Sequence, residues 1–341
     1  MTTTATPPQA PTRTSSTSQP STWRVPIGAF SIPLGLAGLG GAWAAAAQLL
    51  HASSVPATVA YGVSTATWVF FTLVYLAGLR SGTDAFRAQL QHPLTGPLTA
   101  YVPVTAILLL SHYAPQLGDV AAALCYAMVA LLAVNAAALM AHWLRAPQEL
   151  NAFHPGYLLP LSAGPFIASI GLTTLGHPTV AMGAFGVGIY FWLVLGGLIT
   201  GRLFFGSPLP QPLLPALSIL LSPPATACVA WMAIVRGRID ALEAALGTIT
   251  MFLLVVQLFF LAEYLQLPFS IQHWVFTFPI AVLGNLGVRW SAELRFAGWR
   301  PLAWSAVSIS TALILSILAA SLLQAVRWLR YPSAQKAAAL P

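Results

Sequence analysis

The chain has 341 residues, of which 57% are hydrophobic and only 6% are charged, and its mean hydropathy is +0.79. Soluble domains carry about a quarter charged residues, so this composition excludes a soluble enzyme and, equally, a disordered protein. The net charge of +7 comes from basic residues scattered singly along the chain, which argues against nucleic-acid binding. Cys125 and Cys228 lie far apart in apolar runs and predict neither a disulfide nor a zinc site.

Charge-free runs along the chain predict ten membrane-spanning helices. A helix needs roughly 20 apolar residues to cross the hydrocarbon layer. Two of the uncharged runs, 25–79 and 150–201, hold two helices each, because 51–56 and 176–178 interrupt them with turn-forming residues. The predicted helices are 27–50, 57–79, 95–112, 118–143, 156–175, 179–200, 211–235, 242–265, 269–288 and 302–326.

The positive-inside rule orients these helices. With ten spans both termini lie on one side, which collects nine basic residues against five on the other, so we expect cytoplasmic termini in the cell (inner or plasma) membrane. Residues 1–24 are rich in Thr, Ser and Pro and predict a disordered cytoplasmic tail. Residues 331–341 predict a second short tail, and 25–330 form the single transmembrane domain between them.

Prolines mark a repeat in the chain. A proline inside a helix removes a backbone hydrogen bond and kinks the helix. The mid-helix prolines fall only in the odd-numbered predicted helices, at spacings of about one helical hairpin, and the odd helices are also rich in small residues. These prolines are Pro33, Pro103, Pro165, the pair Pro223 and Pro224, and Pro279.

This repeat predicts an all-α integral membrane protein of five helical hairpins in a quasi-fivefold ring around a central pore. Five kinked inner helices would line the pore, and five straighter outer helices would surround them. A carrier built from two inverted five-helix halves would instead repeat every ~150 residues in a chain of this kind. The odd helices as predicted hold no arginine or lysine, so the pore is expected to carry no fixed positive charge.

Four segments of the chain resemble the tellurite-resistance/dicarboxylate transporter family, which includes bacterial TehA proteins and the plant guard-cell slow anion channels. The segments are VPIGAFSIPLGLAGL at 25–39, HPGYLLP at 154–160, QLFFL at 257–261 and WVFTFP at 274–279. The resemblance implies five hairpins around a pore, a homotrimer with one pore per subunit, and passive permeation of small anions. It also implies that Phe278, which precedes the ninth-helix proline, blocks the pore. The residues alone favour the interpretation of Phe278 as one of 17 packing phenylalanines, and only the family resemblance favours a role in the pore.

The absence of charge in the odd-numbered predicted helices also indicates which anions would pass through the pore. Kinked helices present backbone N–H groups and helix-end dipoles that favour anions weakly. A pore without fixed charge would select by the cost of dehydration, so that nitrate passes more readily than chloride. The rival hypothesis is a proton-coupled carrier for tellurite or C4-dicarboxylates, although a dicarboxylate carrier would need a fixed positive charge. An intramembrane enzyme is disfavoured because no nucleophile–base pair or carboxylate pair shares a helix face.

Titratable residues supply the remaining candidates. His92, His154 and His273 open the third, fifth and ninth predicted helices on the cytoplasmic side, where they line a vestibule that titrates between about pH 6 and 7 or simply cap the helices. Glu263 is predicted to be the deepest carboxylate, in a structural or subunit contact. No ligand cluster or cofactor motif occurs, so we expect no metal, no cofactor and no partners beyond anions, lipid and further copies of the chain.

Overall fold

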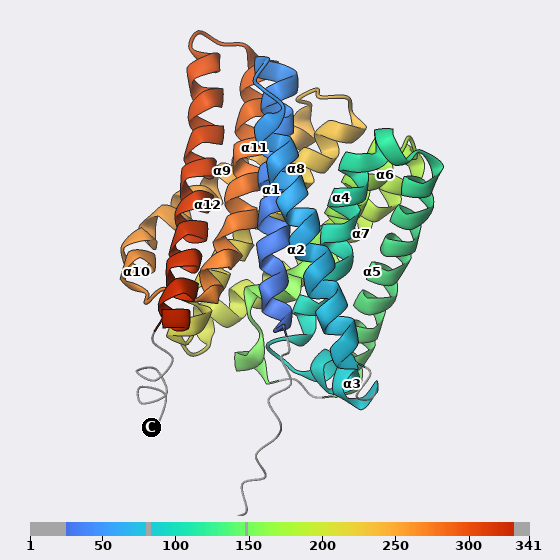
Figure 1. Ribbon diagram of the computed structural model, residues 1–341, viewed down its shortest axis with the longest axis vertical. Helices are drawn as coiled ribbons and strands as arrows, with labels where there is room; N and C mark the ends of the chain where they lie inside the picture. The colour runs from blue at the N-terminus through green and yellow to red at the C-terminus, as the bar shows by residue number, and fades with distance from the viewer. Residues whose placement is uncertain (1–24, 80–82, 147–148, 331–341) are drawn as a thin grey trace, which may run out of the picture.

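The structure is a computed structural model that describes residues 25–79, 83–146 and 149–330, and these residues are helical throughout, without a β-strand (Figure 1). The predicted tails, 1–24 and 331–341, lie outside the described residues. Ten helices in the described ranges are long and apolar enough to cross a membrane, as predicted. They run over Ile27–Leu50, Val55–Gly78, Gly96–Leu117, Asp119–Arg145, Pro155–Thr174, Pro178–Phe205, Gln211–Ile234, Ala241–Phe259, Ile271–Leu294 and Trp299–Arg327.

Burial alternates along the chain and separates inner from outer spans. In the odd-numbered spans 50 to 89% of the residues are buried, whereas in the even-numbered spans only 17 to 28% are. The inner α-helices are α1 (Ser31–Leu50), α4 (Tyr101–Leu117), α6 (Gly164–Thr174), α8 (Ser222–Ile234) and α11 (Thr277–Leu294). The outer helices are α2 (Val55–Leu79), α5 (Asp119–Arg145), α7 (Pro178–Phe205), α9 (Ala241–Phe259) and α12 (Trp299–Arg330), and two short helices are α3 (Thr83–Gln91) and α10 (Leu261–Gln266).

The inner helices form a closed ring. Each inner helix contacts the next in chain order, and α11 closes the ring by contacting α1. Each outer helix packs on the inner helix that precedes it, which confirms the five predicted hairpins. The chain crosses the membrane twice between the start of one inner span and the start of the next, so all five inner helices run in the same direction. In Figure 1 the first helix begins and α12 ends at the same, lower end of the molecule; we call this the terminal side.

The prolines of the repeat lie where each inner span changes helix type. In every inner span a 3₁₀ or π segment precedes the α-helix, and the proline is the second or third residue of that α-helix, where its missing N–H is tolerated. The preceding segments are Ile27–Phe30 before α1, Gly96–Ala100 before α4, Pro155–Tyr157 and Leu159–Ala163 before α6, Gln211–Leu221 before α8, and Ile271–Phe276 before α11.

Side chains of the outer helices hold these transitions in place. A polar group in a bilayer needs a partner within the protein, because lipid tails offer none. Four of the inner spans receive a side-chain hydrogen bond from an outer helix at a carbonyl in or near the transition. These bonds run from Ser64 Oγ to the Pro33 carbonyl (2.7 Å), Trp68 Nε1 to Val102 (3.0 Å), Gln257 Nε2 to Leu217 (3.1 Å) and Ser310 Oγ to Ile280 (2.9 Å).

Candidate functional site: a closed passage inside the helix ring

A small cavity lies inside the ring of inner helices, and all five inner spans line it. Its volume is about 20 Å³, which is room for about one water molecule. A hydrated anion therefore cannot pass through the protein in this conformation. The lining residues are Ser31 and Leu34 from the first span, Tyr101 from the third, Leu159 and Ala163 from the fifth, Ile219 and Ser222 from the seventh, and Trp274, Val275, Phe278 and Pro279 from the ninth.

Phe278 is the one phenylalanine among the residues that line this cavity, and it belongs to the α-helical part of the ninth span. It is the second residue of α11 and only 7% of it is exposed. The preceding Thr277 is fully buried and donates its hydroxyl proton to the Trp274 carbonyl, which ties the 3₁₀ segment to the first turn of α11. Phe278 is therefore held at the cavity by the same helix transition that Pro279 marks.

Sequence reasoning missed most of the other lining residues, although the repeat contains a signal for them. Ser31, Tyr101, Ala163 and Ser222 each lie two residues before a proline of the repeat, Ser222 with respect to Pro224, and Phe278 lies one residue before. The offset of two residues holds in four spans, whereas in the ninth span it falls on Thr277, which does not line the cavity. Applying this rule to every copy of the repeat would have identified Ser31, Tyr101, Ala163 and Ser222, but not Phe278.

Buried hydroxyl groups without partners lie close to the cavity. Thr105 and Thr226 follow Tyr101 and Ser222 by one helical turn, and both are at least 99% buried. Their Oγ1 atoms have no hydrogen-bond partner, and neither does Oγ of Ser162 beside Ala163. A buried unpaired hydroxyl costs free energy. None of these three residues lines the cavity itself, and each hydroxyl is free to donate or to accept a hydrogen bond.

The electrostatics of the cavity come from the backbone, because none of its lining side chains is charged. The cavity lies at the level where the five inner α-helices begin, since its lining includes the first or second residue of α1, α4, α8 and α11 and the residue before α6. The first turn of a helix carries partial positive charge. Because the 3₁₀ or π segment ahead of each α-helix already accepts from the N–H group at the helix start, the five parallel helices offer an anion only a weak dipole field and no free N–H group at this level.

One prediction about the pore is wrong. The ninth span was expected to end at residue 288 and to leave the inner helices without a basic residue, but α11 continues to Leu294 and contains Arg289. The charge-free window ended the predicted helix one residue before this arginine. Helices do not end at a charge when that charge has a polar environment, and the Nε atom of Arg289 donates to Asn285 Oδ1 at 2.6 Å.

The prediction about the deepest carboxylate is also wrong. Glu263 is exposed and lies on the short helix α10, beyond the end of the eighth span. Glu243, which was expected at a helix end, is instead fully buried in the first turn of α9. Its Oε1 accepts a 2.6 Å hydrogen bond from Trp290 Nε1, and Oε2 has no partner. Only the packing of α9 against α11 reveals this burial.

The three predicted vestibule histidines accept local backbone hydrogen bonds on the terminal side: His154 and His273 cap 3₁₀ segments, and His92 lies in the turn that follows α3. Nδ1 of His92 accepts from the N–H of Leu94 (3.2 Å), Nδ1 of His154 from Gly156 (3.1 Å), and Nδ1 of His273 from Ser270 (3.2 Å). His154 is 4% exposed, and its burial lowers its pKa to about 4, although the nearby carbonyls of Pro93 and Leu94 oppose the shift. For His154 the predicted titration between pH 6 and 7 therefore does not hold.

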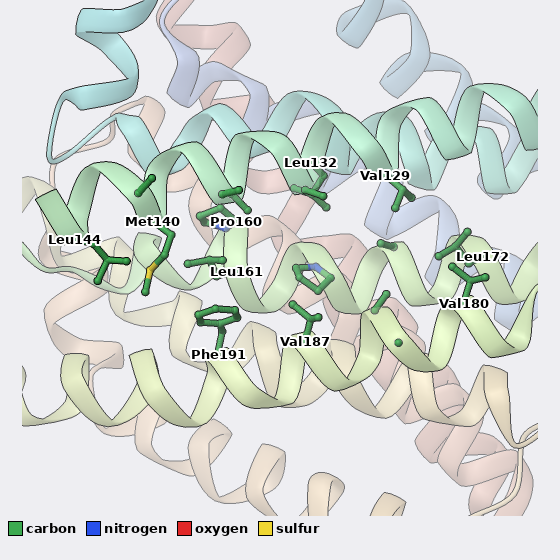
Figure 2. A pocket seen from close by; sticks show the side chains of 18 residues that line it. Val129, Leu132, Met140, Leu144, Pro160, Leu161, Leu172, Val180, Val187 and Phe191 are labelled. Carbon is green, nitrogen blue, oxygen red and sulfur yellow. The ribbon is translucent and has the colours of Figure 1, made fainter.

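A larger groove lies on the lipid-facing side of the ring and differs in character from the axial cavity. It has a volume of about 750 Å³ and lies between α5 and α7, over the fifth inner span (Figure 2). The labelled side chains that point into it, among them Leu132, Met140 and Phe191, are apolar (Figure 2). No charged or hydroxyl side chain lines this groove, so it offers nothing to a small anion.

A ring of five parallel inner helices around one narrow axial cavity defines a multi-pass membrane protein of the channel or transporter class. The chain belongs to the SLAC1 family, described as voltage-dependent anion channel, whose family model matches residues 24–324. This match agrees with the family that the sequence segments resemble.

Individual relatives extend this assignment. The chain is similar to the tellurite resistance protein TehA homolog of Haemophilus influenzae, with 27% identity over 268 residues that cover 76% of this chain and 80% of that protein. It is 27% identical over 165 residues to the guard cell S-type anion channel SLAC1 of Arabidopsis thaliana, covering 48% of this chain and 30% of that protein. The S-type anion channel SLAH2 of Arabidopsis thaliana is 21% identical over 311 residues, covering 89% and 59% respectively.

Proposed function

We propose that this protein is an anion channel through which small monovalent anions, nitrate and chloride, move passively, and that the Phe278 ring is its gate. The observation that carries the proposal is the convergence of five inner spans on one uncharged cavity occupied on one side by Phe278. An aromatic ring in a narrow uncharged passage excludes hydrated ions by steric blockage and by dewetting. Movement of this ring would open the passage.

The chemistry of the passage supports anions as the permeating species. The five parallel inner helices contribute a weak dipole field, and the unpaired hydroxyls of Thr105 and Thr226 can each donate a hydrogen bond to an anion. The absence of a charged side chain among the cavity-lining residues gives weak binding, and weak binding allows an ion to leave as readily as it enters. Selection then follows dehydration cost, which favours nitrate over chloride.

The topology and assembly belong to the same proposal. Both termini lie on the cytoplasmic face, because that orientation places nine of the fourteen basic residues inside. We place the protein in the cell membrane as a homotrimer with one passage per subunit, in keeping with the family that the chain belongs to.

The test is voltage-clamp recording of the wild type beside Phe278→Ala, in nitrate and in chloride. We expect a small wild-type current and a large anion-selective current in the variant, with nitrate more permeant than chloride. The matched control is Phe166→Ala, which truncates a fully buried phenylalanine on α6 that packs outward against Phe185 of α7 at 5.3 Å between ring centroids. This control loosens the packing of an inner helix without touching the cavity lining.

Three results would contradict the proposal. Equal currents in the two alanine variants would show that general loosening, and not the loss of the Phe278 ring, opens the passage. Equal nitrate and chloride permeability would remove the dehydration argument. An absence of current in every variant, together with uptake of tellurite or a C4-dicarboxylate that depends on a proton gradient, would instead establish the carrier.

A further inference from the structure

Arg289 lies on the same face of α11 as Phe278. The two residues are eleven apart in one continuous α-helix, so they differ by only about 20° around the helix axis and by about 16 Å along it. Asn285 lies between them, about 20° to the other side of that face. The guanidinium is therefore placed along the passage, beyond the cavity and toward the membrane face opposite the termini.

One other inner helix repeats this spacing, and a third, α1, contacts the same level through Gly41. On α4, His112 follows the cavity residue Tyr101 by eleven residues, and on α1, Gly41 follows the cavity residue Leu34 by seven, which is two helical turns. These positions belong to the same end of the ring as Arg289. Residues from three inner helices thus meet at one level of the passage, above the side chain that closes it.

Contacts between side chains confirm that this level is assembled as a unit. A Cβ atom on Gly41 would lie 3.3 Å from Asn285 Nδ2 and 3.4 Å from the Tyr61 hydroxyl, so the missing side chain lets both groups approach. The Tyr61 ring, from α2, stacks on the His112 imidazole at 3.7 Å between ring centroids and 9° between planes. Tyr61 is also close enough to Arg289 for the two to interact electrostatically.

Arg289 is oriented but not neutralised. Its Nε–H donates to Asn285 Oδ1 at 2.6 Å, which leaves the terminal N–H groups of the guanidinium for another acceptor. Within the described residues no carboxylate forms an ion pair with it: Glu243 accepts from Trp290, and Glu293, one turn further along α11, is exposed. A half-buried arginine with a fixed orientation and no acidic partner is a binding group for a small oxyanion or halide.

We propose that Arg289, oriented by Asn285 and backed by Tyr61 and His112, is an anion-binding site at the mouth of the passage on the side opposite the termini. The site deepens the proposed channel function, on which it rests, because it concentrates anions next to a cavity that no charged side chain lines. Nitrate or chloride entering from that side would lose part of its hydration shell to the guanidinium before reaching Phe278.

The first experiment compares Arg289→Gln with Arg295→Gln, each in the Phe278→Ala background, during nitrate titration from one side at a time. Arg295 is an exposed arginine at the end of α11, so its variant removes the same charge from the same membrane face. We expect Arg289→Gln to raise the half-saturating nitrate concentration on the side opposite the termini by about five- to tenfold. Nitrate added on the terminal side should act as in the parent, and Arg289→Lys should recover part of the loss.

A second experiment measures binding without conduction. A ligand that binds the folded protein raises its midpoint of thermal unfolding. Purified wild type, Arg289→Gln and Arg295→Gln are unfolded in sodium nitrate and in sodium gluconate at equal ionic strength, and the nitrate-dependent rise should be lost only in Arg289→Gln. Equal nitrate effects in the two variants would overturn the site. An absence of current in the Phe278→Ala background would overturn the channel, while the thermal comparison would still decide the site.

Discussion

Gly38 of α1 lies directly against the ring of Phe278: a Cβ atom at residue 38 would lie 3.1 Å from Cδ2 of that ring and 2.9 Å from the Cβ atom of Ala281. The close approach of α1 and α11 at the cavity therefore depends on a residue without a side chain. The Phe278 ring is confined between this helix and the cavity, which limits the directions in which it can move.

This contact predicts that Gly38→Ala lowers stability. Neither neighbour of the new methyl group is the far end of a flexible side chain, so α1 and α11 must separate at a cost of about 1–3 kcal/mol. The control is Gly62→Ala on α2, where an added Cβ meets no atom within 4 Å, and where alanine should be neutral or stabilising by up to about 1 kcal/mol. Thermal unfolding of the purified protein in detergent distinguishes the two; a Gly38→Ala midpoint at or above that of Gly62→Ala would contradict the packing argument.

The hydrogen bond from Ser64 to the Pro33 carbonyl predicts a second effect on stability. Ser64 is fully buried on α2, and its replacement by alanine removes an interhelical bond at the transition into α1. Such bonds in membrane proteins contribute about 0.6 to 2 kcal/mol. Ser305→Ala is the control, because the Ser305 hydroxyl is exposed and bonds within α12. We expect a lower unfolding midpoint for Ser64→Ala alone, and equal midpoints would show that the bond contributes nothing.

Burial of His154 predicts loss of stability in acid. The folded protein holds this imidazole neutral down to a pKa of about 4, whereas in the unfolded chain its pKa is 6.5. Between these values the unfolded state binds the extra proton, so the stabilisation is complete above pH 6.5 and is lost as the pH falls toward 4. The difference in pKa corresponds to about 3 kcal/mol when the loss is complete.

The measurement is the unfolding midpoint at pH 7.5 and at pH 5 for the wild type, His154→Gln and His92→Gln. Glutamine keeps an acceptor for the Gly156 N–H and has no proton to bind in this range. The acid-induced drop should therefore be smaller in His154→Gln than in the wild type, while His92→Gln, which changes an exposed histidine, should keep the full drop. A full acid-induced drop in His154→Gln would show that other groups cause it.

Much of the fold could be predicted because a bilayer imposes simple rules on sequence. The number of spans, the five hairpins and the division into inner and outer helices follow from apolar length and from prolines confined to odd helices. The position of Phe278 was expected only from the family resemblance, and the cavity lining places its ring at the axis. The spans, the hairpins and the division of the helices are properties of local sequence and periodicity.

Other features depend on which helices meet, and no local pattern contains that information. Glu243 lies in the first turn of α9 and Glu263 lies twenty residues later, in α10, yet only Glu243 is enclosed, because the first turn of α9 packs against Trp290 of α11. Arg289 ended a charge-free run and so seemed to end a helix, but Asn285 and Tyr61 supply a polar environment that lets α11 continue.

The sequence by itself therefore determined the ten spans, their pairing and the proline-marked inner helices, because each depends on the length and period of an apolar segment. Only the tertiary structure decided how narrow the cavity is, which carboxylate is buried and which arginine faces the passage. Those properties depend on distances between residues such as Gly38 and Phe278, or Gly41 and Asn285, which lie some 240 residues apart in the chain and are brought together only when α11 closes the ring against α1.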